Sequence, residues 1–296
     1  MIPPTYLPAA FSLTATGVWG TSDFLGGLGA RRVNTFLFTL FVHLSAMVMA
    51  GLLALALGSQ FLDLHAALWS LGAGIVGGLG VALFYRALAV GKMGLVAPLS
   101  AVLGAGVATM IAGFSQGIPT RRHLAGFVLA GIGVWLISRT EKEAGGTDGS
   151  PVPAQATENE GRPQGLGLAI LAGLGFAGFF FCIHRAGDGS PLWIAVFSRI
   201  ASLFVSISVI AATRQFHPIS PRIFGLAFFA GILDITGTVV FVRATQIGRL
   251  DSAVVLSSLY PAITVILARI FLHEHFSRTR TVGMLAALAA VPMIAG

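Results

Sequence analysis

Long apolar segments recur along the whole chain and are separated by short polar stretches. Ten of them reach about 17–25 residues, the length that crosses the hydrocarbon core of a bilayer as a helix. The alternating pattern of barrel strands is absent, and a helix pairs every backbone amide within its own segment. The sequence therefore predicts ten transmembrane helices, at Pro8–Gly29, Asn34–Leu57, Ala66–Val90, Met93–Phe114, Arg122–Ser138, Gly165–Arg185, Pro191–Thr213, Arg222–Thr245, Ser252–Leu272 and Ser277–Gly296.

One polar stretch differs from the other connections. Thr140–Gln164 holds seven charged residues and three prolines and shows no apolar periodicity. Such a composition favours a flexible hydrophilic linker. The linker, residues 140–164, divides the chain into a first unit of five spans, residues 1–139, and a second unit of five spans, residues 165–296.

The two units are related in sequence. A shift of 157 positions lays Phe84–Ile137 on Phe241–Ile294 without a gap, and 13 of the 54 pairs are identical, against roughly five expected from so apolar a composition. Because each unit has an odd number of spans, the second must be inverted relative to the first. Inverted repeats are typical of carriers that alternate between two related states.

The end of the second unit resembles a known family. Pro261 lies in the penultimate helix, Glu274 follows thirteen residues later beside a short polar turn, and a last helix of small residues closes the chain. This pattern resembles an EamA-type domain of the drug/metabolite transporter superfamily, and the stretch WGTSDFLGG from Trp19 to Gly27 resembles the family's opening helix. The resemblance implies an all-α membrane protein of two EamA-like repeats around a central cavity, which usually exports metabolites or drugs.

The first unit departs from the family pattern. Gly104 stands where the proline is expected, and Gly117 replaces the Glu. Only the general architecture is therefore carried over to this unit. The motifs specify neither the substrate nor the coupling ion.

Composition agrees with a membrane protein. Of the 296 residues, 55% are hydrophobic and 10% are charged, whereas soluble domains carry about 25% charged residues. The net charge of +7 comes from Lys and Arg spread singly or in pairs between apolar segments, which indicates membrane-facing loops and no nucleic-acid partner. The lone Cys182 excludes an internal disulfide and multi-cysteine metal sites.

Sequence motifs that normally indicate an enzyme or a cofactor site occur here at positions or spacings that do not suit those roles. Two G-x-G-x-x-G matches, beginning at Gly72 and Gly173, lie inside apolar spans, so helix packing is the favoured interpretation. The cluster His273–His275 lacks the zincin spacing, because the position four residues after His273 is Ser277. The sequence thus predicts no cofactor, no metal and no catalytic site.

Ionisable side chains inside apolar spans are the candidate functional residues, since a charge at that depth costs about 3 kcal/mol. Four lie well inside their spans: Asp23, His43, Arg199 and Asp234. His43 and Arg199 occupy corresponding places in the two units and could face one cavity from opposite halves. For His43, a neutral imidazole bonded to a neighbouring helix is an equally good interpretation; for Asp234, a fixed Asp–Arg pair between helices is the alternative.

Three aromatic residues complete the candidate cavity. Trp19 lies one helical turn from Asp23, which suits an organic substrate but equally suits ordinary packing. Tyr85 and Tyr260 could stack on a ligand or belong to the interfacial belt. Arg86 and Arg243 lie near span ends, where snorkelling to the interface explains them.

The distribution of basic residues predicts how the chain is oriented in the membrane. With Arg199 and Arg269 left out, loops and span ends after odd-numbered spans hold 11 Lys and Arg, against 5 after even-numbered spans. The positive-inside rule then places the linker in the cytoplasm and both termini outside. The family resemblance implies termini inside, so the orientation stays open.

The sequence favours a secondary transporter in the cytoplasmic (inner) membrane that moves a small-molecule substrate by alternating access, with protons as one coupling option. A membrane-embedded enzyme or a non-transporting sensor is the alternative, and would need a clustered acid, base and nucleophile or an appended domain. Amino acids, sugars, purines and hydrophobic cations all remain possible substrates, and the direction of transport and the oligomeric state stay open.

Overall fold

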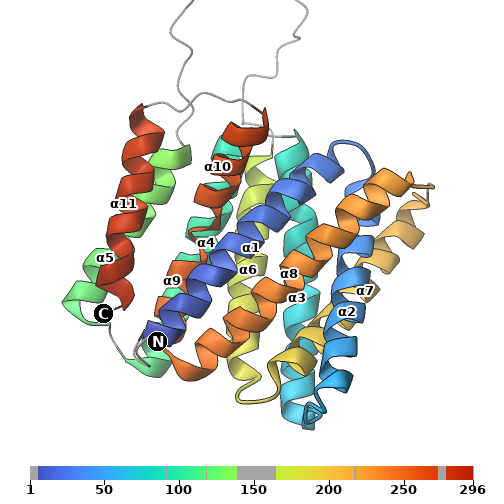
Figure 1. Cartoon of the computed structure of the whole chain (residues 1–296), viewed down its shortest axis with the longest axis horizontal. Helices are drawn as coiled ribbons and strands as arrows, with labels where there is room; N and C mark the ends of the chain where they lie inside the picture. The colour runs from blue at the N-terminus through green and yellow to red at the C-terminus, as the bar shows by residue number, and fades with distance from the viewer. Residues whose placement is uncertain are drawn as a thin grey trace, which may run out of the picture.

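A computed structural model of the chain describes residues 6–90, 93–117, 119–138, 165–216, 218–272 and 278–295. These ranges contain eleven helices and no strand (Figure 1): α1 (Leu7–Ala30), α2 (Thr35–Ala56), α3 (Leu64–Val90), α4 (Met93–Gln116), α5 (Arg121–Ser138), α6 (Leu166–Arg185), α7 (Pro191–Thr213), α8 (Pro221–Ile247), α9 (Leu250–Ser257), α10 (Tyr260–Leu272) and α11 (Arg278–Ala295). Nine predicted spans match single helices to within two residues at each end. The predicted linker at residues 140–164 lies outside the described residues.

Local signals explain where several helices begin. The Asn34 side chain accepts hydrogen bonds from the backbone amides of Phe36 and Leu37 at 2.9 and 3.2 Å and caps α2. Ser220 caps α8 in the same way, and prolines occupy the first turns of α1, α7 and α8. Proline is favoured there because the first amides of a helix have no partner within it.

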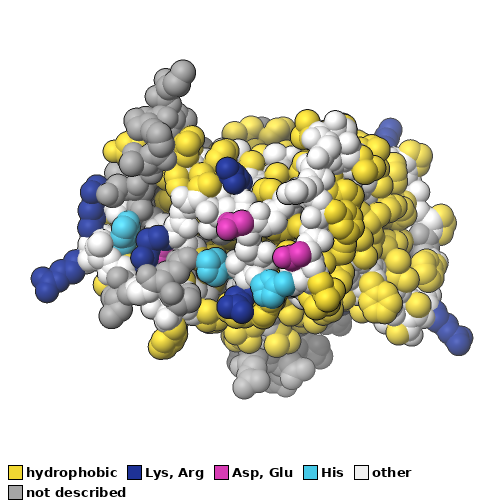
Figure 2. All heavy atoms as spheres, turned by 90° about the horizontal axis from the view of Figure 1, so that it is seen from below, with side chains coloured by type: hydrophobic (Ala, Val, Ile, Leu, Met, Phe, Trp, Pro, Cys, Tyr) yellow, Lys and Arg dark blue, Asp and Glu magenta, His cyan; other side chains and the backbone are white. Residues whose placement is uncertain are grey.

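The outer surface is that of a membrane protein. α2, α3, α6, α7 and α8 are each long and apolar enough to cross a bilayer, and large apolar side chains such as Leu55, Phe204 and Phe229 are exposed on them. Figure 2 views the molecule from the end where both termini lie, and acidic and histidine side chains gather on this face while hydrophobic side chains extend along its edge. Lipid is the solvent that suits such an edge.

The helices pack in a two-fold pattern. α3 packs on α6 as α8 packs on α1, and α2 packs on α8 as α7 packs on α3. Likewise α4 packs on α6 as α9 and α10 pack on α1, while α2 pairs with α7 and α5 with α11. Each of these helix contacts therefore recurs between the two corresponding helices of the other set of five. The predicted architecture of two five-span repeats around a centre accounts for this pattern.

Corresponding helices run in opposite directions, as inverted repeats require. Asn34 at the start of α2 contacts Gln215 beyond the end of α7. At the other end of the pair, the Phe61 ring lies 4.8 Å from that of Trp193, centroid to centroid. In Figure 1, α5 and α11 lie side by side, and α11 ends beside the beginning of α5, near the mark of the C-terminus.

The ninth span is broken, which the sequence analysis did not predict. α9 ends at Ser257 and α10 begins at Tyr260, because Pro261 has no amide to donate to the Ser257 carbonyl and its ring crowds that carbonyl. The freed carbonyls find a partner on α1: the Thr16 hydroxyl lies 2.7 Å from the Leu256 oxygen and 3.4 Å from the Ser257 oxygen. Discontinuous helices of this kind form binding sites in other carriers.

Both G-x-G-x-x-G segments lie inside helices and serve packing, as predicted. A Cβ atom at Gly74 of α3 would lie 1.9 Å from the Ser198 carbonyl oxygen of α7. One at Gly175 of α6 would lie 2.8 Å from the Gly80 Cα of α3. These glycines allow three helix backbones to approach closely around the centre of the molecule.

Candidate functional site

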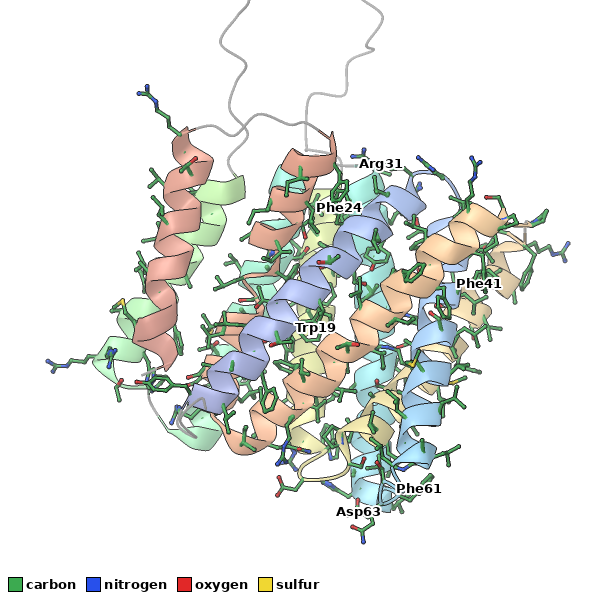
Figure 3. The ribbon with its side chains drawn as sticks, in the orientation of Figure 1. Trp19, Phe24, Arg31, Phe41, Phe61 and Asp63 are labelled. Atoms are coloured by element: carbon green, nitrogen blue, oxygen red, sulfur yellow. The ribbon has the colours of Figure 1, made fainter. Side chains whose placement is uncertain are left out.

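A cavity of about 70 Å³ lies in the interior, between helices of both sets of five. Trp19 on its wall lies halfway along α1, between Arg31 at one end of the molecule and the N-terminal end of the helix (Figure 3). Aromatic, small and ionisable side chains form the lining: Trp19, Asp23, Gly77, Val81, Ser100, Ala101, Gly104, Phe176, Phe179, Phe180, Arg199, Asp234, Thr238, Ser258 and Tyr260. Five of the seven candidate site residues named from the sequence therefore meet here: Trp19, Asp23, Arg199, Asp234 and Tyr260.

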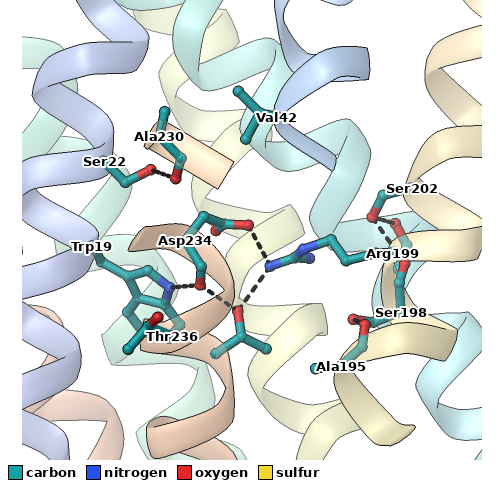
Figure 4. Close-up of polar contacts among 12 residues, drawn as sticks. Trp19, Ser22, Val42, Ala195, Ser198, Arg199, Ser202, Ala230, Asp234 and Thr236 are labelled. Atoms are coloured by element: carbon teal, nitrogen blue, oxygen red, sulfur yellow. Dashed lines mark hydrogen bonds and ion pairs between the residues drawn. The ribbon is translucent and has the colours of Figure 1, made fainter. Parts of the chain in front are cut away.

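A buried ion pair forms one wall. Arg199 Nη2 of α7 lies 2.8 Å from Asp234 Oδ2 of α8, and their side chains are 5% and 15% exposed. The same Nη2 donates to Thr238 Oγ1 at 2.8 Å, and Thr238 donates in turn to the Asp234 backbone carbonyl at 3.0 Å. Figure 4 shows these contacts joining α7 to α8. The charge of Asp234 is thus balanced by Arg199 of the neighbouring helix, which offsets the free-energy cost of a carboxylate in mid-span.

Trp19 ties α1 to this wall. Its indole Nε1 donates to the Asp234 backbone carbonyl at 3.1 Å, and its ring fits against Gly237, where a Cβ atom would lie 2.5 Å from Trp19 Cδ1. α8 is continuous through Gly237. Gly237, which has no side chain, makes room for the indole ring.

Asp23 is the second carboxylate of the cavity and belongs to α1. Its neighbour Ser22 donates to the Ala230 carbonyl of α8 at 2.9 Å. Tyr85 of α3 packs against this part of α1, since a Cβ atom at Gly26 would lie 2.3 Å from Tyr85 Cζ. Tyr85 itself is 2% exposed and stands behind the cavity wall. Among the described lining residues, Arg199 is the sole cation, and it is engaged by Asp234.

His43 lies apart from the cavity lining, whereas one of the two interpretations of the sequence had it face the cavity from the half opposite Arg199. It is 1% exposed on α2, one residue after Val42, whose carbonyl oxygen would lie 2.3 Å from a Cβ atom at Gly231 of α8. Neither ring nitrogen has a hydrogen-bond partner among the described residues. The buried Ser206 hydroxyl of α7 also has none among them. The alternative interpretation, an imidazole bonded to a neighbouring helix, has no such bond here.

We expect His43→Leu to unfold at the same temperature as the unchanged protein in detergent, or higher. A buried polar group without a partner costs about 1–3 kcal/mol, and an apolar side chain of similar size removes that cost. Ser202→Ala is the matched control, because the Ser202 hydroxyl donates to the Gly74 carbonyl at 2.8 Å and its loss should lower stability. If His43→Leu lowered the unfolding temperature as much as Ser202→Ala, the imidazole would have a bonding partner.

Phe179 and Phe180, adjacent residues of α6, both line the cavity. The Trp19 ring centroid lies 6.5 Å from that of Phe179 and 6.3 Å from that of Phe180. Ser258, at the break between α9 and α10, is another lining residue that the sequence analysis missed. Pro261 was the available signal, since a proline within an apolar span predicts an interrupted helix.

The remaining named residues lie elsewhere. Pro261 is buried in the first turn of α10, and Glu274 lies outside the described residues. Arg86 and Arg243 are exposed near the ends of α3 and α8, where snorkelling accounts for them.

A second cavity, of about 250 Å³, opens at the end of the molecule where both termini lie. Pro8, Ser12, His123, Arg249 and Ser252 are among its lining residues. Leu256, the residue whose carbonyl accepts a hydrogen bond from Thr16, also lines this cavity. The contact between α1 and α9 therefore stands between this outer cavity and the central one.

Comparison with known proteins agrees with this architecture. A solved structure described as "Crystal structure of protein" superposes with a TM-score of 0.73 at 19% sequence identity, and the match covers 97% of this chain and 95% of that one. At that identity the likeness shows the fold. No curated protein sequence matches the chain.

The family comparison is more specific. Residues 163–296, the second set of five spans, match the model of the EamA-like transporter family. The members of this family are transporters of small molecules and are embedded in membranes as multi-pass proteins. The second half of the chain, residues 163–296, is thus an EamA-like domain, of the kind found in the drug/metabolite transporter superfamily.

Proposed function

We propose that the protein is a secondary carrier that exports a small metabolite or drug across the cytoplasmic membrane by alternating access and takes up a proton in exchange. The substrate site is the central cavity. One observation supports this above the others: two carboxylates, Asp23 of α1 and Asp234 of α8, face the same buried cavity with a single guanidinium, that of Arg199.

The charges of this cavity do not balance. With both carboxylates ionised, the three groups carry one net negative charge, in surroundings where an unpaired charge costs several kcal/mol. Arg199 compensates Asp234 at 2.8 Å, so Asp23 is left to bind a proton or a cation. We assign the exchangeable proton to the carboxylate pair, with Asp23 as its main carrier while the ion pair is closed and Asp234 as the alternative when it opens.

The break in the ninth span suits the role of a moving gate. Ser258 at the break lines the central cavity, and Leu256 and Ser257 just before it are held to α1 through Thr16. Release of these two contacts would join the outer cavity to the central one. Alternating access then consists of closing this route while a corresponding route opens toward the other face.

The test is transport by the purified protein in sealed vesicles. A metabolite library is screened for uptake and efflux with and without an imposed pH gradient. For each compound that moves, the pH gradient should drive its accumulation. Complete absence of gradient-driven movement across the library would contradict the proposal.

Asp23→Asn is expected to remove the dependence of that transport on the pH gradient, because the amide keeps the size of the side chain and cannot exchange a proton. Asp234→Asn should slow transport and alter its pH dependence, since Arg199 then loses its counter-charge. Asp188→Asn is the control, as Asp188 is an exposed acid in the loop between α6 and α7. Unchanged rate and pH dependence in both cavity variants would show that neither carboxylate takes part in coupling.

A further inference from the structure

The central cavity has a distinctive chemistry beyond its place in a carrier. Its ionisable groups differ in their partners: Arg199 donates to Thr238 and pairs with Asp234, while Asp23 has no ion-pair partner among the described residues. An anionic ligand would meet an uncompensated carboxylate and an arginine whose charge is already balanced by Asp234. A ligand with one positive charge would complete the balance.

The walls around these carboxylates are aromatic. Trp19, Phe176, Phe179, Phe180 and Tyr260 all line the cavity. The faces of such rings carry negative potential and attract ammonium groups, most strongly where water is excluded. Apolar walls also favour a ligand whose remaining body is apolar.

One hydroxyl on the wall has no partner within the described protein. Tyr260 is 7% exposed, and its Oη makes no hydrogen bond to another described residue. It belongs to the first turn after the break in the ninth span. A ligand in the cavity could accept a hydrogen bond from it or present its own N–H group to the oxygen.

The size of the cavity sets a further limit. Its volume of about 70 Å³ corresponds to about five waters at roughly 15 Å³ each, whereas sites for drug-sized ligands measure about 300–1,000 Å³. In this conformation the cavity suits an ammonium group and a compact body.

Taking these features together, and resting on the proposed role of this cavity as the substrate site, we propose that the protein binds small organic monocations, namely a primary amine joined to one compact aromatic or apolar group. The ammonium group lies at Asp23, in the place that the exchanged proton leaves. The apolar group packs between Trp19 and the Phe179–Phe180 pair.

The test is equilibrium binding to the purified full chain in detergent at neutral pH, which needs neither a gradient nor transport. Three probes share one skeleton and differ in charge: 2-phenylethylamine, 2-phenylethanol and 3-phenylpropionate. We expect the amine to bind about tenfold more tightly than the alcohol, because only the amine places a positive charge beside Asp23. A tenfold change corresponds to about 1.4 kcal/mol, close to the contribution of one hydrogen bond between charged groups. The carboxylate should bind most weakly, because its charge repels that of Asp23. Asp23→Asn should weaken binding of the amine about tenfold and leave the alcohol unaffected, whereas Asp188→Asn should change neither.

Equal affinity for the three probes, tighter binding of the carboxylate, or no binding of the amine would each overturn the inference. The comparison of probes on the unchanged protein remains decisive even if Asp23→Asn does not fold. If the variant folds and binds the amine as tightly as before, Asp23 is not the ammonium site. Binding of the amine without transport in vesicles would count against the proposed carrier function alone, while gradient-driven transport of other compounds without amine binding would count against this inference alone.

Discussion

Replacing Arg199 with leucine is expected to lower the free energy of unfolding by about 3–5 kcal/mol, the usual cost of leaving one partner of a buried ion pair without its counter-charge. The Arg199 side chain is 5% exposed, and its Nη2 holds both Asp234 and Thr238. The substitution leaves the Asp234 carboxylate in mid-span without a cation. Unfolding of the purified protein in mixed micelles of increasing denaturing detergent measures the change.

The double variant Arg199→Leu/Asp234→Leu separates charge from packing. Removing both charges relieves the penalty, and replacement of a buried pair by apolar residues is often neutral or stabilising. We therefore expect the double variant to recover most of the lost stability and still to fail in transport. If the double variant were as unstable as Arg199→Leu alone, the loss would come from packing of the long arginine side chain and not from the unpaired carboxylate.

Gly74→Ala is expected to destabilise the protein by about 3 kcal/mol or more, within the range for overpacking at a site that cannot relax. The added Cβ atom would lie 1.9 Å from the Ser198 carbonyl oxygen and 2.8 Å from the Ala201 Cβ atom. Both obstacles belong to the body of α7, so α3 and α7 would have to separate. Because Ser198 precedes Arg199, the same displacement should also weaken the ion pair and reduce transport.

Gly72→Ala is the matched control, in the same helix and only two residues away. A Cβ atom there would meet only the Cys182 Sγ atom, at an ordinary contact distance of 3.7 Å. Alanine also favours the helix over glycine by up to about 1 kcal/mol, so this variant should be as stable as the unchanged protein or slightly more so. Similar unfolding free energies for the two variants would show that α3 and α7 are not packed as closely as the structure indicates.

The number and limits of the membrane-spanning helices follow from the sequence alone. A bilayer demands apolar segments of a certain length and a backbone paired within each segment, and both requirements are local, so they can be read along the chain. α7 occupies the range predicted for it, Pro191–Thr213, without change. Internal similarity between the two sets of five spans also predicted their inverted arrangement, because that arrangement depends only on an odd number of spans.

The candidate residues were found from the sequence by the cost of burying charge, but their partners were not. Asp23, Arg199 and Asp234 stand out because each is ionisable at a depth where water is absent. Which of the two acids the arginine compensates depends on how α7 and α8 pack, over a separation of 35 positions. Only the structure shows that Asp234 pairs with Arg199 and that Arg243 lies exposed near the end of α8.

Tertiary structure also decided which side chains face the cavity. His43 and Arg199 occupy corresponding places in the two sets of spans, yet Arg199 lines the cavity and His43 is buried outside it. Phe179 and Phe180 look like ordinary packing residues and are part of the wall. The physical reason is that lipid, the protein interior and an apolar cavity all favour the same apolar residues on a helix face. Hydrophobic periodicity therefore cannot show which of the three a face contacts. Only the positions of the other helices determine that.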